Sequence, residues 1–132
     1  MRVATEIDLF RFSAATWNAH RIHYDRDQAI AEGLAGPVVQ AHLVGAWLLD
    51  LTNDALGPGD SVARFSWRNL FPIHPRTTVV VRATPSADPD AYDLSVTDTS
   101  GVICASGRAE IKRGVSRDQA ELAYGSDGGA QS

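Results

Sequence analysis

The feature that most restricts the fold of this chain is one long apolar helix that is followed only by strand-like segments. Residues 38–55 place apolar side chains at helical spacing, and small residues such as Gly45 and Ala46 fill positions between them. A helix that is apolar nearly all round is central and buried. The Gly-Pro-Gly sequence at 57–59 predicts where this helix has ended.

Four segments after the helix have the composition or the alternation of β-strands. Residues 61–70 and 91–98 alternate apolar and polar side chains, residues 77–84 are rich in β-branched residues, and residues 102–113 alternate again. Turn-forming residues at 86–90 and 99–101 separate the last three segments. The pattern therefore predicts at least four antiparallel strands.

The segment before the long helix is shorter and less regular. Residues 7–12 are predicted as a short strand, and residues 14–18 as a brief helix capped by Ser13. Residues 28–32 predict a second short helix that ends at Gly33.

This order of elements predicts an α+β fold in which one antiparallel sheet wraps around a single long buried helix, the hot-dog arrangement. We expect one domain over residues 1–113 and a disordered tail over residues 114–132, where the sequence becomes small and polar. A sheet with one helix on one face leaves open edges, so we expect a dimer, either with a second copy or with a related hot-dog subunit.

Composition narrows the classes of function. The chain has 132 residues and a formal net charge of −4, which argues against nucleic-acid binding. Cys104 is the only cysteine, so neither an intrachain disulfide nor a cysteine-rich metal site is expected. The N-terminal residues lack a signal-peptide pattern, and no apolar run approaches a membrane span. We expect a cytoplasmic protein with no cofactor, no metal and no membrane partner.

Residues 12–29 carry the densest group of chemically active side chains, on an irregular segment of the kind that often holds catalytic groups. This stretch resembles the motif of the MaoC-like hydratase/dehydratase family, Gly-Asp-x-Asn-Pro-Leu-His-x-Asp-x-x-x-Ala. In that alignment His23 falls on the catalytic histidine, Asn18 on the catalytic aspartate and His20 on the asparagine. Asp25 and Ala29 match the end of the motif.

Two stretches resemble one subgroup of the family in particular. Residues 18–25 read Asn-Ala-His-Arg-Ile-His-Tyr-Asp, and residues 65–73 read Phe-Ser-Trp-Arg-Asn-Leu-Phe-Pro-Ile. Both are similar to the subgroup that includes fungal-type mitochondrial 3-hydroxyacyl-thioester dehydratases and mesaconyl-CoA hydratases. The resemblance covers roughly residues 7 to 112 of the chain.

The resemblance implies reversible conversion of a 2-enoyl thioester to a 3-hydroxyacyl thioester, bound to CoA or to an acyl carrier protein. His23 would be the general acid/base, because imidazole exchanges protons near neutral pH. Asn18 would orient the water or the hydroxyl, because an amide cannot act as a base.

The start of the long helix would supply N–H groups to the thioester oxygen. Gln40 and Ala41 stand where the family often has His-Gly, and are candidate substrate-binding residues. His20 is a candidate for the same role or a residue that holds its loop. Arg21 is a candidate contact to a substrate phosphate or to another subunit.

Other functions stay open. The replacement of Asp by Asn18 and of Gly by Ala41 favours a non-catalytic hot-dog subunit that pairs with a catalytic partner. A third alternative is a tailoring enzyme of polyketide or secondary metabolism that performs an elimination or cyclisation. A thioesterase would need a carboxylate on the central helix near its start, and Asp50 lies far from it.

Several other residues have two interpretations. Arg68, Arg76 and Arg82 are either contacts to the diphosphate of CoA or solvated strand residues. Trp47 is a core residue or part of an acyl channel. The spacing of His20 and His23, without clear companion ligands, argues against a metal site.

Overall fold

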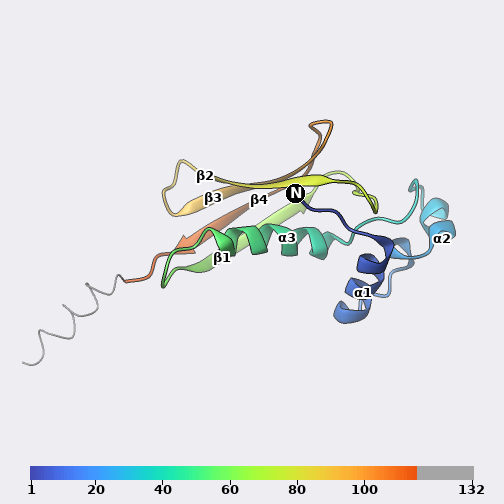
Figure 1. The fold of residues 1–132 in the computed structure, drawn as a ribbon, viewed down its shortest axis with the longest axis horizontal. Coiled ribbons are helices and arrows are strands. Elements are labelled where there is room, and N and C mark those ends of the chain that lie inside the picture. The colour runs from blue at the N-terminus through green and yellow to red at the C-terminus, as the bar shows by residue number, and fades with distance from the viewer. Residues whose placement is uncertain (116–132) are drawn as a thin grey trace, which may run out of the picture.

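Four antiparallel strands form one sheet in the order β1–β4–β3–β2. The structure is a computed structural model, and it describes residues 1–115 (Figure 1). The register pairs Phe65 with Ala109 between β1 and β4, and Leu94 with Gly107 between β3 and β4. The strands are β1 (Ser61–Asn69), β2 (Val79–Pro85), β3 (Ala91–Asp98) and β4 (Ile103–Lys112). These strands confirm the four predicted segments, with ends that agree to within about two residues.

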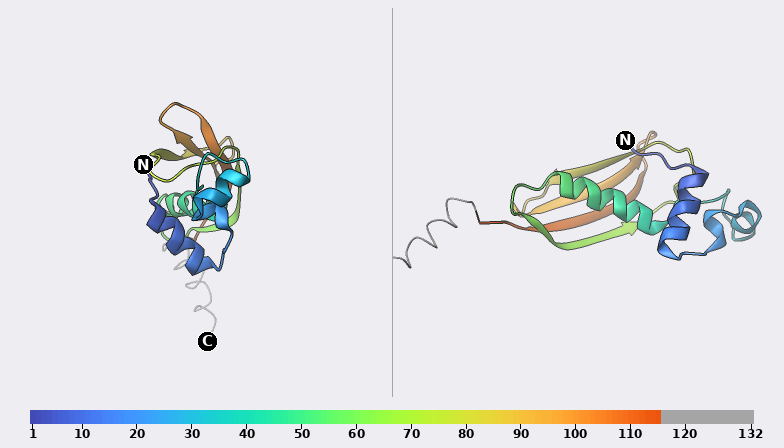
Figure 2. Two further views of the ribbon diagram at one scale, coloured as in Figure 1. Left: turned by 90° about the vertical axis from the view of Figure 1, so that its right-hand side faces the viewer. Right: turned by 60° about the horizontal axis from the view of Figure 1, so that its bottom comes forward.

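The long helix α3 (Ala41–Asp54) lies along the inner face of the curved sheet (Figures 1 and 2). Val44, Trp47 and Leu48 are buried and belong to one core cluster with sheet residues such as Val79 and Val96. The helix is central, as predicted, but its burial is one-sided, because its other face turns away from the sheet. The side chains exposed on that face include Ala41, His42, Ala46, Asp50 and Asn53.

Gly45 allows α3 and β1 to approach closely. A Cβ atom at Gly45 would lie 2.6 Å from two atoms of the Trp67 indole, so any larger side chain would displace that ring. The Trp67 Nε1–H donates to the backbone carbonyl of Ala41 at 3.2 Å. The indole therefore packs over the first turns of α3 and fixes the start of the helix against the sheet.

The N-terminal prediction was wrong at one element. The segment 7–12 is not a strand but part of α1 (Glu6–Thr16), which also includes most of the brief helix predicted over 14–18. The side chains of Thr5 and Asp8 form a capping box, which satisfies free N–H groups at the helix start. The strand-like part of the N-terminus is a single bridge between Arg2 and Val79.

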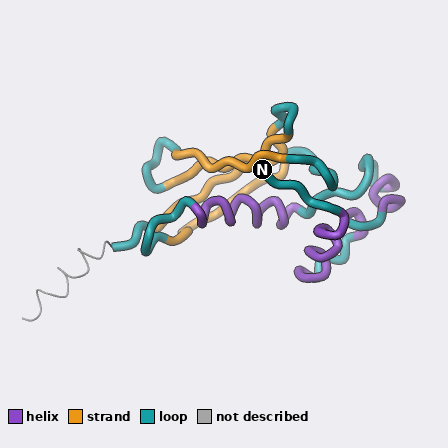
Figure 3. The backbone as a smooth tube through the Cα atoms, viewed as in Figure 1, coloured by secondary structure: helices purple, strands orange, loops and turns teal. Residues whose placement is uncertain are grey.

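A small helical region, here called the helical arm, comprises residues 5–32 and projects beyond one end of the sheet (Figure 3). It contains α1, the 3-10 turn η1 (Arg21–His23) and α2 (Arg26–Ala31). The helix α2 confirms the helix predicted over 28–32, although it begins two residues earlier. Asp25 caps it, and Gly33 follows it with a φ of 87°. We call α3 and the four strands together the sheet–helix body.

The predicted tail begins at Gly114, whose N–H donates to Asp60 Oδ1 at 2.9 Å. From residue 116 onward the predicted tail lies outside the described residues. In the described part of the chain, none of the helices has the length and apolarity needed to cross a bilayer. The residues 1–115 also contain no cluster of three or more metal-ligating side chains.

Candidate active site

An open cavity of about 340 Å³ lies where the helical arm meets the end of the sheet–helix body. Three segments form it: the arm and the loop after it, the start of α3, and the loop that follows β1. The lining residues are Ile22, His23, Leu34, Val38, Val39, Ala41, Val44, Asn69, Leu70, Phe71, Pro72 and Ile73. The cavity therefore joins the two stretches, 18–25 and 65–73, that carry the family resemblance.

His23 is the titratable side chain on this wall, and it is only 7% exposed. Its Nδ1 lies 2.8 Å from the backbone carbonyl of Val38. Because a carbonyl oxygen only accepts hydrogen bonds, Nδ1 carries the proton in the neutral ring. The second ring nitrogen, Nε2, then holds a lone pair and is able to accept a proton.

The extended segment 37–39 connects the arm to the loop after β1. The N–H of Val38 donates to the carbonyl of Ile22 at 3.0 Å, and the N–H of Val39 donates to the carbonyl of Ile73 at 2.7 Å. His74 Nδ1 donates to the carbonyl of Pro37 at 2.9 Å. Two histidines from opposite sides thus bind consecutive carbonyls, which fixes both walls of the cavity to one strip of backbone.

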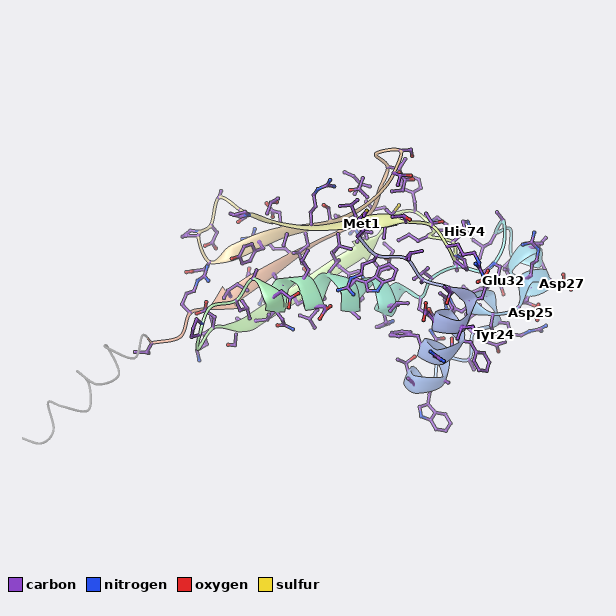
Figure 4. The ribbon with its side chains drawn as sticks, viewed as in Figure 1. Met1, Tyr24, Asp25, Asp27, Glu32 and His74 are labelled. Carbon is purple, nitrogen blue, oxygen red and sulfur yellow. The ribbon has the colours of Figure 1, made fainter. Side chains whose placement is uncertain are left out.

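Figure 4 shows His74 between the end of the sheet and the arm, which carries Tyr24, Asp25, Asp27 and Glu32. The Tyr24 hydroxyl donates to the backbone carbonyl of Ala19 at 2.8 Å, which closes the loop before η1. The loop that precedes His23 is therefore held closed by the side chain of Tyr24, which follows His23 at the end of η1.

The first turn of α3 borders the cavity through Ala41. No side chain in the described part of the chain caps this end of the helix, and the carbonyl of Gln40 accepts from the N–H groups of Leu43 and Val44. The N–H groups at the very start of a helix have no partner within the helix. They are therefore available to an oxygen atom that carries developing negative charge.

The side chain of Gln40 points away from this cavity. It is fully buried, and its Nε2 donates to the carbonyl of Leu9 at 2.6 Å and to the hydroxyl of Ser13 at 2.9 Å. Its Oε1 has no partner among the described residues. Gln40 thus connects α1 to the start of α3, and it is not among the residues that line the cavity.

Asn18 lines a different cavity, together with Phe10, Trp17 and Tyr24. Its Oδ1 accepts the backbone N–H of His20 at 3.3 Å, and its own N–H donates to the carbonyl of Ser13 at 3.0 Å. Trp17, which precedes it, has a φ of 56° and is 94% exposed. The structure therefore places Asn18 in the same loop as His23 but does not bring the two side chains to one cavity.

His20 and Arg21 are exposed residues of the arm. His20 Nδ1 accepts the N–H of Ile22 at 3.3 Å, and its Nε2 lies 3.9 Å from Glu32. The rings of His20 and His23 meet edge to face, with centroids 5.9 Å apart. Arg21 donates to Asp25 from Nε at 3.0 Å and from Nη2 at 2.5 Å.

The ion pair between Arg21 and Asp25 also determines the electrostatics of the arm. The guanidinium of Arg21 holds the pKa of the Asp25 carboxyl below its ordinary value, and the N–H of Gln28 lowers it further. Asp25 in turn raises the pKa of Arg21. Asp25 is therefore ionised at neutral pH and serves as the N-cap of α2.

The remaining candidates lie elsewhere. Arg76 pairs with Glu6, and Arg68 and Arg82 are exposed strand residues. Trp47 belongs to the core, and Asp50 pairs with Arg2. Cys104 is buried as predicted, and burial raises the pKa of its thiol.

The sequence did not identify the apolar wall. Leu34, Leu70, Phe71 and Ile73 line the cavity but carry no reactive group. Their signal was the stretch Leu-Phe-Pro-Ile directly after β1, where the chain leaves the sheet at the same end as the start of α3. Val38 was also missed, because its contribution is a backbone carbonyl.

The chain is similar to known proteins in both its sequence and its fold. The sequence model of a family described as hydroxyacyl-thioester dehydratase type 2 matches residues 2–75. A curated relative, the mesaconyl-C(4)-CoA hydratase of Chloroflexus aurantiacus, is 36% identical over 104 residues. The match covers 78% of this chain but only 36% of the relative, so the chain spans about a third of that protein's length.

Solved structures share the fold. An (R)-hydratase from A. caviae involved in PHA biosynthesis matches with a TM-score of 0.70 and 19% identity, over 84% of this chain and 89% of that chain. The ChsH1–ChsH2 complex from Mycobacterium tuberculosis matches with a TM-score of 0.69 and 20% identity, over the same shares. Together with the sheet around α3, these matches confirm the hot-dog fold.

Proposed function

Because the chain belongs to the hydroxyacyl-thioester dehydratase type 2 family, we propose that it catalyses the reversible hydration of a 2-enoyl thioester, with His23 as the general acid/base. The observation that carries this proposal is the hydrogen bond from His23 Nδ1 to the carbonyl of Val38. It leaves the Nε2 lone pair on a ring that borders an otherwise almost wholly apolar cavity.

In the hydration direction, His23 Nε2 takes a proton from water while the water oxygen forms a bond to C3. The electron pair of the C2–C3 double bond moves toward the thioester carbonyl, whose oxygen becomes negative. Free N–H groups at the start of α3, beside Ala41, stabilise that charge. The protonated imidazole of His23 then delivers this proton to C2, the carbonyl re-forms, and the product is the 3-hydroxyacyl thioester. Dehydration reverses each step.

Asn18 is proposed to orient the water or the hydroxyl. Its Oδ1 is engaged by the N–H of His20, so its amide NH2 group is the part that remains for a substrate oxygen. What supports this role is its position five residues before His23 in the motif. We expect Asn18→Ala to lower the hydration rate about tenfold. Asn18→Asp keeps an acceptor for the His20 N–H and adds the carboxylate that the family motif has at this position, so it should retain more of the hydration rate than Asn18→Ala.

We also propose that the chain associates with a second hot-dog subunit, either its own copy or a relative. Within residues 1–115, the strand β1 pairs with β4 alone, which leaves backbone groups free along its outer edge. The described residues of one chain also leave the outer face of α3 uncovered. The ChsH1–ChsH2 and HadBC complexes of Mycobacterium tuberculosis share this fold.

A second candidate function is a non-catalytic subunit of such a complex. The observation that favours it is the separation of Asn18 and His23 into different cavities. In this case the chain would shape the acyl pocket of a catalytic partner and would show no hydration by itself.

One assay distinguishes the two functions. The purified chain is mixed with crotonyl-CoA, and the loss of the enoyl thioester and the appearance of 3-hydroxybutyryl-CoA are both measured. We expect turnover by the chain alone. If neither crotonyl-CoA nor longer 2-enoyl-CoA thioesters are hydrated by the folded protein, the hydratase proposal fails and the non-catalytic function replaces it.

A further inference from the structure

We infer that the cavity beside His23 selects an uncharged acyl chain and discriminates against an acyl group that ends in a carboxylate. This inference rests on the proposed function for its biological meaning, because it concerns the acyl group of the same thioester. The inference concerns the binding of the acyl group, so CoA thioesters that are not turned over can test it.

The chemistry of the wall is the first argument. Apart from His23 and Asn69, every side chain that lines the cavity is apolar. The described residues place no lysine, arginine, aspartate or glutamate on this wall. A carboxylate that enters such a cavity gives up its hydration and finds no cation to replace it, which is costly.

The nearby arginines do not change this conclusion. Arg21 is engaged with Asp25, and Arg76 is engaged with Glu6. Arg26 extends toward Gly36, where its Nη1 lies 3.4 Å from the position that a Cβ would take, but it does not line the cavity. The cations around the site therefore lie outside the acyl cavity.

The apolar wall also continues outward along the loop after β1. Leu70 and Phe71 border the cavity and are 45% and 58% exposed. The N–H groups of both residues donate to the carbonyl of Cys104, at 2.8 and 3.2 Å, so this loop is fixed beside the start of β4. Ile103, the first residue of β4, is itself exposed. An apolar chain that leaves the cavity thus meets further apolar surface rather than charge.

The test compares two CoA thioesters of similar size that cannot be hydrated. Butyryl-CoA ends in a methyl group, and succinyl-CoA ends in a carboxylate. Isothermal titration of the wild-type protein with each should give a dissociation constant at least about tenfold lower for butyryl-CoA. Equal affinity, tighter binding of succinyl-CoA, or no binding of either thioester would overturn the inference.

A pair of variants locates the effect. Leu70→Arg places a cation on the wall at an exposed position that tolerates it, whereas Leu70→Gln removes the apolar side chain without adding charge. The ratio of the two dissociation constants should shift toward succinyl-CoA by about tenfold in Leu70→Arg and by much less in Leu70→Gln. An unchanged ratio in Leu70→Arg would place the acyl end elsewhere and contradict the inference.

Failure of this inference and failure of the proposed function would give different results. A protein that prefers butyryl-CoA but does not hydrate crotonyl-CoA would support the inference and remove the catalytic role. A protein that hydrates crotonyl-CoA but binds succinyl-CoA as tightly as butyryl-CoA would support the catalytic role and contradict the inference.

Discussion

In the sheet–helix body the residues are held mainly by buried apolar side chains, whereas in the helical arm they are held mainly by polar contacts to the backbone. The body contributes most of the core cluster, including Leu48, Val79 and Val96. The arm buries few side chains, and Phe10 and Trp17 remain exposed. The loop of the arm is fixed instead by residues such as Tyr24 and Asp25.

This difference explains where the candidate catalytic group lies. The body supplies rigid walls, and the arm presents His23 from a loop that is fixed by individual hydrogen bonds. A region with few buried apolar contacts opens locally at a lower free energy than a packed core. We therefore expect perturbations of the body to unfold the whole protein, and perturbations of the arm to act locally.

The largest effect is expected in the body. Leu48 is fully buried on α3 at the centre of the core. Leu48→Ala should lower the free energy of unfolding by about 2–5 kcal/mol, because it removes buried apolar area and leaves a cavity. Chemical denaturation followed by circular dichroism measures this loss. A loss below about 1 kcal/mol would mean that α3 is not the centre of the core.

The next effect concerns the junction between the two regions. Gln40→Leu removes the two hydrogen bonds from α3 to α1 and should cost about 1–3 kcal/mol. Thr52→Val is the matched control, because Thr52 is equally buried but donates only to Leu48 within its own helix. Hydrogen exchange should become faster in α1 for Gln40→Leu and not for Thr52→Val. Equal exchange of α1 in both variants would contradict a junction role for Gln40.

A smaller effect is expected at the start of the arm. Thr5→Ala breaks the capping box of α1 and should cost about 1 kcal/mol. Thr16→Ala is the control, because the Thr16 hydroxyl donates to the carbonyl of Phe12 inside the same helix. Thermal unfolding should separate the two variants. If both are as stable as the wild type, the cap does not contribute to the docked arm.

The smallest effect is a pH dependence of the arm. Arg21 lowers the pKa of Asp25 in the folded state, so the ionised carboxylate stabilises the fold at pH values above its unfolded pKa of about 3.9. This contribution is lost as the pH falls through the lower folded pKa. The thermal midpoint of Asp25→Asn should therefore lie slightly below that of the wild type at pH 7 and approach it in acid. A constant difference over this range would exclude ionisation as its cause.

The difference between the sheet–helix body and the helical arm also explains which elements could be predicted from the sequence. The strands and α3 were predicted because their periodicity follows from burial of one face. The segment 7–12 was wrongly predicted as a strand, because its apolar residues suggested alternation, although Leu9 is the only one of them that is buried. The Thr5-x-x-Asp8 pattern was the local signal for a helix start.

The candidate site was predictable where side chains carry the chemistry and not where the backbone does. His23 was identified from its motif, and it does line a cavity. The carbonyl of Val38, the path of segment 37–39 and the inward or outward direction of Gln40 depend on tertiary contacts between distant residues. Asn18 was assigned from alignment alone, and its place in a neighbouring cavity required the fold.

The central claim is that His23 provides the proton-transfer group, and one comparison tests it most directly. His23→Ala and His74→Ala each remove a ring whose Nδ1 donates to a carbonyl of segment 37–39, but only His23 lines the cavity. The rate of crotonyl-CoA hydration should fall at least about 100-fold in folded His23→Ala and by much less in His74→Ala. A folded His23→Ala variant that keeps the wild-type rate would contradict the claim.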